Sequence, residues 1–486
     1  MSQEWIYTVV YLAWLVGAAC FVLGLHQMNS PATARNGNRL SASGMAIAVV
    51  ATLVGLATGS VPGIGSGGLS ATAWIIIIVG LVIGGGAGFW QARTVKMTAM
   101  PQLVSLFNAV GGGAAALVAI DDFIRLTNGG GAPVDTTIFV VLGAVIGSVT
   151  FSGSLIAGGK LQGLIPGKPI YVPGGQITTA VIAVIAVIGT IILIVGSAGA
   201  ITLSSTVTLL LLALVVLAGL AFGVTMVLPI GGADMPVVIS LLNSFTGTAA
   251  AMSGFVIQNP VLIIAGALVG ASGGILTKLM ADAMNRSVIN IMVGGFGGGE
   301  GTVAVTGVGG GAVREVSADD AAIQLAYAQH VIIVPGYGLA VAQAQHAVRE
   351  LADVLEARGV DVKYAIHPVA GRMPGHMNVL LAEANVPYPQ LKEMDDINPE
   401  FDNADVALVV GANDVTNPAA RRAGTPVSGM PILDVDHAKS IIVIKRSMGR
   451  GYAGIDNELY TNPKTGMLFA DAKEGLQALT AAVKAV

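Results

Sequence analysis

The sequence is poor in cysteine and in charge. A single cysteine, Cys20, occurs in 486 residues, which excludes a disulfide-stapled scaffold. Charged residues make up only 11% of the chain, against about 25% in a typical soluble protein, so a fully soluble enzyme is excluded as well. The net charge of −4 offers no basic excess for binding nucleic acid. Because residues 1–290 hold 15 charged residues and residues 301–486 hold 36, we expect a membrane domain followed by a water-soluble one.

Nine apolar stretches match the roughly 20 residues that a helix needs to cross a bilayer. They cover residues 5–25, 44–60, 73–90, 100–120, 136–158, 175–196, 205–228, 235–257 and 260–280. If the loop after the first stretch is cytoplasmic, eight lysines and arginines lie on that side and one, Arg125, on the other. This asymmetry predicts an odd number of spans, an amino terminus outside and a carboxyl-terminal domain in the cytoplasm.

Polar residues within these stretches are costly and therefore informative. Asn108, Ser154 and Asn243 fall inside the fourth, fifth and eighth stretches, and Asp234 lies near a cytoplasmic end. Each is compatible with a satisfied hydrogen bond between helices, and together they are compatible with a hydrated path for an ion or a proton. The many glycines of the spans likewise indicate either tight helix packing or a moving interface.

The second part of the chain predicts a different architecture. Residues 294–311 form a glycine-rich stretch that is typical of a flexible coil, and its composition is compatible with a joint between moving domains or with an inert tether. We therefore divide the chain into a membrane domain over 1–290, a linker over 291–317 and a soluble domain over 318–486. The soluble domain alternates expected helices at 319–329, from about 343 to 358 and at 375–384 with expected strands at 330–334, 360–366, 391–394, 406–410, 431–434, 440–445 and 467–470. This alternation predicts a parallel, doubly wound, Rossmann-like α/β sheet.

The turn after the first strand predicts nucleotide binding. Its pattern, Gly336-x-Gly338-x-x-Val341, supplies the tight turn that a pyrophosphate needs, although the third glycine is replaced. The second strand ends without the acidic residue that holds an NAD ribose, whereas a later strand ends in Lys445-Arg446-Ser447. Those cations are compatible with a solvated strand end, but together with the missing acid they favour NADP over NAD.

Longer motifs resemble a known family, the β subunits of proton-translocating NAD(P) transhydrogenases. The motifs lie at residues 367–384, 411–414, 445–448 and 451–454 in the soluble part, and at 231–238 and 283–287 in the membrane part. The resemblance implies nine spans and a cytoplasmic domain that binds NADP(H). It also implies an α subunit that binds NAD(H) and contributes further membrane helices, a dimer of such protomers, and a location in the inner membrane of a bacterium. Hydride would pass between the two nicotinamides, coupled to proton translocation.

The resemblance also assigns roles to residues. It places Asp414 and His367 near the nicotinamide as catalytic candidates, Gly336 and Gly338 at the phosphates, and Arg372 at the pyrophosphate. The other cofactor-binding candidates are Tyr337, Val341, Asp414, Lys445, Arg446 and Ser447, with Gly451 and Tyr452 on a lid. The candidates for coupling to the proton path are Asn108, Ser154, Asp234, Asn243, Gly273 and Arg286. No metal site is expected.

One departure from the family concerns the proton path. Some members carry a histidine at the place of Asn108, and an amide cannot store a proton. None of the six histidines, at 26, 330, 346, 367, 376 and 437, falls in the middle of a span. We therefore expect a partner subunit to supply the titratable group near Asn108. The competing hypothesis is a transporter or channel whose nucleotide-binding domain only senses redox state.

Overall fold

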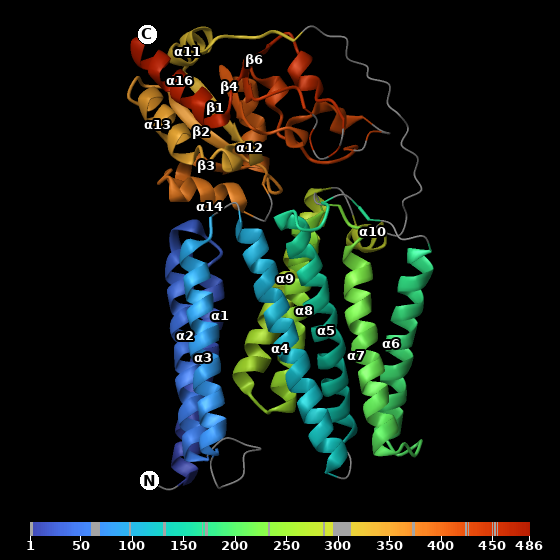
Figure 1. Cartoon of the computed structure of the whole chain (residues 1–486). Helices are drawn as coiled ribbons and strands as arrows, with labels where there is room; N and C mark the ends of the chain where they lie inside the picture. The colour runs from blue at the N-terminus through green and yellow to red at the C-terminus, as the bar shows by residue number, and fades with distance from the viewer. Residues whose placement is uncertain are drawn as a thin grey trace. The chain divides into compact units, whose positions relative to one another are not determined.

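A computed structural model describes the chain except for residues 1–2, 60–68, 97–98, 130–132, 168, 171–173, 232–233, 285–286, 295–312, 372–374, 423–424, 426, 450, 452 and 454. The chain forms two compact units (Figure 1). The first comprises Met1–Gly231 and Val237–Thr277, and the second Gly232–Pro236 and Lys278–Val486. The glycine-rich stretch falls largely outside the described residues, so the linker and the domain boundaries at 290 and 318 stay predictions.

The first unit is a bundle of long apolar helices. Within the described part of the chain, nine helices have the length and composition to span a membrane, which confirms the predicted number. They are α1 (Gln3–Gln27), α2 (Pro31–Thr58), α3 (Ala71–Thr94), α4 (Met100–Asn128), α5 (Val134–Gln162), α6 (Gly175–Ser197), α7 (Ser205–Val227), α8 (Met235–Val256) and α9 (Pro260–Ala283). Helix α2 begins at Pro31, well before the apolar run at 44, because polar residues extend a helix beyond the apolar length without breaking its hydrogen bonds.

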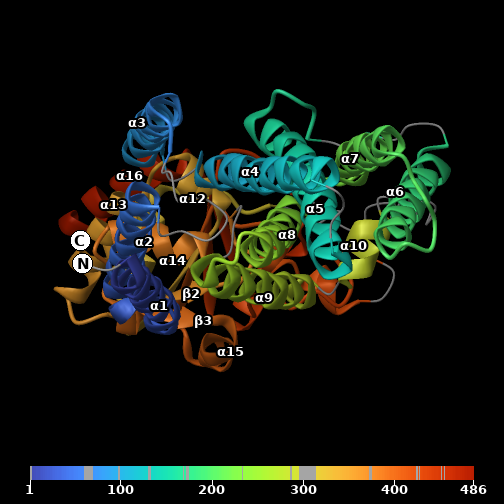
Figure 2. The same ribbon diagram turned by 90° about the horizontal axis from the view of Figure 1, so that it is seen from below.

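Glycines bring several of these helices into close contact, as the packing interpretation predicted. A Cβ added to Gly147 of α5 would lie 2.5 Å from the carbonyl oxygen of Gly112 in α4. A Cβ on Gly247 of α8 would lie 2.4 Å from the backbone nitrogen of Gly270 in α9. Figure 2 shows α4 running beside both α5 and α8. Any larger side chain at these positions would force the backbones apart.

The second unit contains a six-stranded parallel sheet, which confirms the predicted fold class. Its strands are β1 (His330–Pro335), β2 (Asp361–Ile366), β3 (Leu391–Glu393), β4 (Val406–Val410), β5 (Ser440–Lys445) and β6 (Thr465–Phe469), in the order β3-β2-β1-β4-β5-β6. All five residues of β4 are buried, as expected for a sheet covered on both faces. The strand order reverses between β1 and β4, and in such sheets ligands bind outside the carboxyl ends of the strands at that point.

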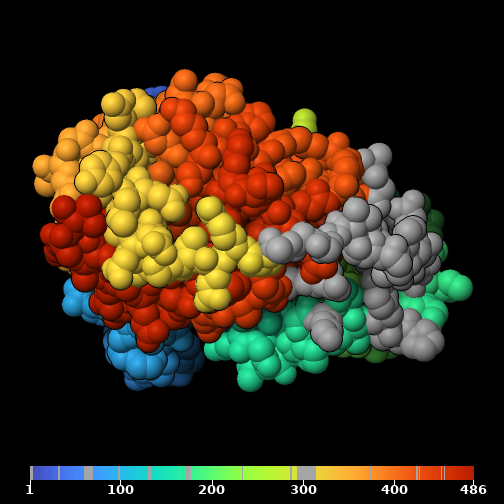
Figure 3. Space-filling view, turned by 90° about the horizontal axis from the view of Figure 1, so that it is seen from above, coloured from blue at the N-terminus to red at the C-terminus, as the bar shows by residue number. Residues whose placement is uncertain are grey.

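Helices cover the sheet. They are α11 (Ala318–Ala326), α12 (Tyr337–Val341), α13 (Gln345–Glu356), α14 (His376–Glu383), α15 (Met394–Ile397) and α16 (Ala472–Ala485), and the short α10 (Val288–Gly294) also belongs to this unit. Helices α11 and α16 pack side by side (Figures 1 and 3). Helix α13 buries Val348, Leu351 and Leu355 on one face, which is the amphipathic pattern expected from the sequence.

The strand predicted at 431–434 is wrong. These residues form no strand, although Ile432 and Leu433 are buried. Separate hydrogen bonds, and not a strand ladder, pair their backbone groups. The N–H of Leu433 donates to the Val415 carbonyl at 2.9 Å, and Asn398 Nδ2 donates to the Ile432 carbonyl at 2.9 Å. A short apolar run can therefore enter the core as irregular chain when side chains and loops supply its hydrogen bonds.

Candidate functional site

The turns that follow β1 and β4 pack directly on each other at the switch point of the sheet. Gly336 N donates to the Val410 carbonyl at 2.9 Å, and Gly338 N donates to the Gly411 carbonyl at 2.9 Å. A Cβ on Gly338 would lie 2.7 Å from Gly411 Cα, and one on Gly336 would lie 2.3 Å from the Cα of Ala412. Both motif glycines are thus required for the contact between the two turns, a role that the phosphate-binding motif alone did not predict.

Two separate helices, α12 and α13, follow this turn. Helix α12 has only five residues, and Gln343, with φ of 50°, interrupts the chain before α13 begins at Gln345. The helix expected after Ala342 is therefore α13, and a single helical turn precedes it. On that turn Val341 is 47% exposed, and the Tyr337 ring lies 6.4 Å from the His376 ring of α14. Exposed groups on this turn are accessible to a ligand at the sheet edge.

Asp414 lies in the segment after β4 and holds the segment that follows β5. The N–H of Ala453 donates to Asp414 Oδ2 at 3.0 Å, and a Cβ on Gly451 would lie 2.3 Å from Asp414 Oδ1. With its amide oriented so that both ends are satisfied, Asn413 accepts from Gly451 N at 2.7 Å and from Lys445 Nζ at 3.2 Å. The structure therefore brings together the predicted residues Asp414, Lys445 and Gly451.

Lys445 ends β5 and folds back onto its own turn. Its Nζ donates to the Gly449 carbonyl and lies 4.7 Å above the Tyr460 ring. Burial lowers the pKa of the Lys445 ammonium, and the neighbouring carboxylates of Asp414 and Asp456 oppose that shift. Arg446 and Ser447, which follow it, are exposed. This end of β5 therefore presents two cations and a hydroxyl beside the switch point, a donor set suited to a phosphate group.

His367 follows β2 and is 1% exposed. The N–H of Val369 donates to His367 Nδ1 at 3.2 Å, so the ring proton resides on Nε2, which donates to the Pro431 carbonyl at 2.8 Å. Burial lowers the pKa of the ring to about 4, which keeps it neutral at pH 7. With both nitrogens bonded to backbone, His367 ties the end of β2 to the chain before β5. Its geometry is that of a positioning group.

In the membrane unit the structure places Asn108 on the face of α4 that meets α8. Asn108 Nδ2 donates to the Ile239 carbonyl at 3.3 Å, and Thr246 Oγ1 donates to the Asn108 carbonyl at 3.3 Å. One turn earlier, the buried Ser105 donates from Oγ to the Ser154 carbonyl of α5 at 2.7 Å. Asn108 and Ser154 therefore belong to one polar contact region across three helices, with Ser105 between them.

The remaining coupling candidates are a closely packed glycine, two half-buried polar residues and one residue outside the described part of the chain. Gly273 is packed against α8: a Cβ there would lie 2.9 Å from Ser244 N, and its carbonyl accepts from Ser240 Oγ at 3.2 Å. Asn243 in α8 and Asp234 just before it are each half-buried. The coupling candidate Arg286 lies outside the described residues, as do the cofactor-binding candidates Arg372 and Tyr452.

Sequence reasoning missed four residues that the structure brings to these sites. Ser105 and Lys160 are buried in the membrane unit, and Asn457 and Tyr460 are buried beside the turn that follows β4. Tyr460 donates to the Ala412 carbonyl at 3.1 Å, and Asn457 Nδ2 to the Asn413 carbonyl at 2.9 Å. Lys160 counted as a loop cation in the charge analysis, yet it lies within α5, 4% exposed, and donates to the carbonyls of Leu228 and Ile230 after α7. The only sign in the sequence that Lys160 is buried was its position directly after an apolar run of small residues.

Comparisons with known proteins identify the family. The family described as NAD(P) transhydrogenase beta subunit matches residues 10–482. Two proteins from Rhodospirillum rubrum, one of them from a named strain and both called NAD(P) transhydrogenase subunit beta, are each 49% identical over 475 residues. The match covers 96% of this chain and 97% of each relative. It sets aside the alternative of a transporter that only senses redox state. The chain, a multi-pass membrane protein with a doubly wound soluble domain, therefore belongs to the NAD(P) transhydrogenase beta subunit family.

Proposed function

We propose that this chain binds NADP(H) at the carboxyl edge of its sheet, and that an alpha subunit presents NAD(H) for hydride exchange coupled to proton translocation. The family uses NAD(P), and a beta subunit has an alpha partner. The observation that carries the choice of NADP(H) is the charge at two strand ends. The segment after β2 begins with the buried, neutral His367, whereas β5 ends at Lys445 and Arg446 follows it.

The residues at this edge fit NADP(H) chemically. NAD sites usually offer a carboxylate after the second strand to the ribose hydroxyl, and a 2′-phosphate would be repelled by it. Lys445, Arg446 and Ser447 can instead donate charge-assisted hydrogen bonds to the phosphate. Asp414 and Gly451 hold the segments that flank that position. The cofactor supplies the hydride, so the protein needs no nucleophile of its own and contributes binding and orientation.

The test measures how substitutions at the two ends of β5 change the affinity of the chain for NADP(H) and for NAD(H). We expect Lys445→Ala and Arg446→Ala to weaken NADP(H) binding by about 10- to 100-fold each, because a hydrogen bond to a charged group contributes roughly 1.5–3 kcal/mol. NAD(H) binding should change little. The matched control is Lys439→Ala, since Lys439 lies just before β5 and pairs with Asp405 at 2.8 Å. Calorimetry on the purified chain that shows equal losses for both nucleotides would refute the 2′-phosphate assignment.

The proton path is proposed to run beside Asn108. Asn108, Ser154 and Asn243 offer amides and hydroxyls, which orient water but do not store a proton. We infer that a titratable side chain of the alpha subunit, a histidine by preference, lies near Asn108 and exchanges the proton. Asp234, Gly273 and Arg286 are proposed to couple this exchange to the nucleotide domain. The protomers form a dimer in a bacterial inner membrane, with the amino terminus outside and the nucleotide domain in the cytoplasm.

Removal of that partner side chain tests the path. Replacing it with a residue that does not titrate should abolish transfer driven by a pH gradient in vesicles and leave NADP(H) binding unchanged. The control is the same substitution at a lipid-facing position of the partner. Proton pumping that persists after every membrane-depth titratable residue of the partner has been replaced would show that water within this subunit suffices.

A further inference from the structure

Helix α3 differs from the other spans because it packs against very little of this chain. None of its residues, all of which the structure describes, is buried. Its apolar side chains are open, with Ile76 67% and Trp90 66% exposed. A helix that crosses a membrane alone can face lipid on every side, so exposure by itself says nothing about a partner.

The glycines of α3 give one face of the helix a special shape. Gly80, Gly84 and Gly88 recur every fourth residue and therefore lie on one face. A Cβ added to any of them would meet no atom of the chain within 4 Å. Elsewhere in the bundle, a neighbouring helix occupies the space beside such glycines, as Gly112 of α4 does beside Gly147 of α5. Glycine within a helix lowers helix stability by about 1 kcal/mol relative to alanine, and contact with lipid does not offset that loss.

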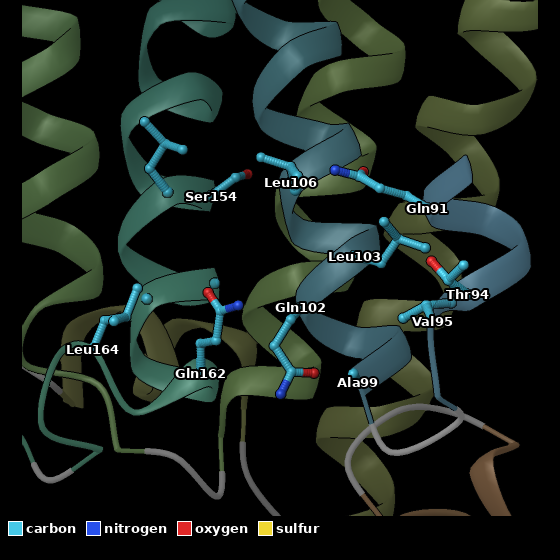
Figure 4. Close-up of a pocket in the computed structure, with 13 residues that line it drawn as sticks. Gln91, Thr94, Val95, Ala99, Gln102, Leu103, Leu106, Ser154, Gln162 and Leu164 are labelled. Atoms are coloured by element: carbon cyan, nitrogen blue, oxygen red, sulfur yellow. The ribbon is translucent and has the colours of Figure 1, made fainter. Parts of the chain in front are cut away.

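The same face continues towards a mainly apolar cavity that a few polar side chains also line. Gln91 and Val95, which follow Gly88 on this face, line a cavity of about 390 Å³ between the ends of α3, α4 and α5 (Figure 4). Ser154 projects into it from α5 towards Leu106 of α4. The glycine face of α3 therefore turns to the same side as this cavity, and the face and the cavity together are called the α3 groove.

Two buried oxygens at this cavity call for an occupant that donates hydrogen bonds. Ser154 is 1% exposed, and its Oγ has no partner among the described residues. Gln102 donates from Nε2 to the Leu161 carbonyl at 3.1 Å, while its buried Oε1 likewise has no partner in the described part of the chain. A buried unsatisfied polar atom costs roughly 1–3 kcal/mol, so the bundle as described is incomplete here.

We propose that a transmembrane helix of the alpha subunit lies in this groove, with small residues against Gly80, Gly84 and Gly88 and a hydrogen-bond donor opposite Ser154. The proposal rests on the proposed function, which requires an alpha subunit with membrane helices. A helix suits the groove because glycine faces admit close backbone approach between helices. A lipid chain would fill the volume but would leave Ser154 Oγ and Gln102 Oε1 without donors.

The test introduces a bulky side chain on each of two faces of α3 in the co-expressed complex of both subunits. Gly84→Leu fills the groove, whereas Gly86→Leu makes the same change about 200° around the helix axis, where a Cβ also meets no atom within 4 Å. In neither variant does the new Cβ lie within 4 Å of another part of the chain. We expect Gly84→Leu to lower the amount of alpha subunit that copurifies by at least about fivefold, the lower end of an overpacking penalty, and Gly86→Leu to leave it unchanged.

A second measurement identifies the occupant. A photoreactive phenylalanine analogue in place of Gln91, which already carries a long side chain on this face, should cross-link to a membrane helix of the alpha subunit, which mass spectrometry of the product would show. Cross-linking to a second copy of this chain, or to lipid alone, would overturn the proposal, as would equal retention of the alpha subunit in both leucine variants. If no alpha subunit copurifies with the unmodified chain, the proposed function itself fails, and NADP(H) binding by the chain separates that outcome from misfolding.

Discussion

Lowering the pH should destabilise the soluble domain through one residue, His367. Its ring is neutral in the folded chain because burial lowers its pKa to about 4, whereas an unfolded histidine has a pKa of about 6.5. Above pH 6.5 the ring is neutral in both states and contributes nothing to the pH dependence. Between pH 6.5 and pH 4 the unfolded chain binds a proton that the folded chain does not, so the free energy of unfolding falls as the pH falls.

The size of this effect follows from the shift. Each pH unit within the window removes about 1.4 kcal/mol, and the full difference of about 2.5 units removes roughly 3 kcal/mol by pH 4. That is a large part of the 5–15 kcal/mol typical of a folded domain. The other groups of the domain also titrate, so the prediction concerns the difference between the native chain and a variant that lacks the imidazole.

The variant is His367→Gln, whose amide can still donate to the Pro431 carbonyl but does not titrate. Hydrogen exchange of the amides in β1 and β4, corrected for the intrinsic effect of pH, reports the free energy of opening. We expect the native chain to lose about 3 kcal/mol more than the variant between pH 6.5 and pH 4. Parallel curves for the two chains would refute the argument that His367 is buried in its neutral form.

Two further substitutions test packing in the two units. Gly411→Ala should destabilise the soluble domain by about 2–5 kcal/mol in urea unfolding, because its φ of 67° disfavours a Cβ that would also lie 2.5 Å from Gly338 Cα. The control Gly359→Ala, with φ of 89° and open space, should cost only about 1–2 kcal/mol, and equal losses would contradict the contact between the two turns. Lys160→Met should lower the melting temperature of the membrane unit in detergent, since the Leu228 and Ile230 carbonyls lose a charged donor worth roughly 1.5–3 kcal/mol each, whereas Lys160→Arg should retain part of it. A methionine variant that melts like the native chain would show that water replaces the ammonium.

The sequence by itself determined the two architectures. Apolar length is a local property, because each spanning helix satisfies its backbone within its own segment, and the nine predicted spans are nine helices in the described residues. All six strands were also predicted within two residues of their observed bounds, since buried parallel strands are short apolar runs between turns. The predicted strand at 431–434 failed because an apolar run indicates burial, and only its neighbours decide whether a ladder forms.

Only the tertiary structure decided what the singled-out residues touch. Gly338 was predicted from a phosphate-binding pattern, yet the space its missing side chain leaves is filled by Gly411, more than 70 residues further along the chain. Lys160 was counted as a loop cation, but in the structure it donates to carbonyls of the segment that follows α7. Both α3 and α4 contain several glycines, but those of α4 contact α5 and α8, whereas a Cβ on those of α3 would meet no atom of this chain within 4 Å. Contacts between distant segments depend on how helices and strands pack, and no local pattern encodes that packing.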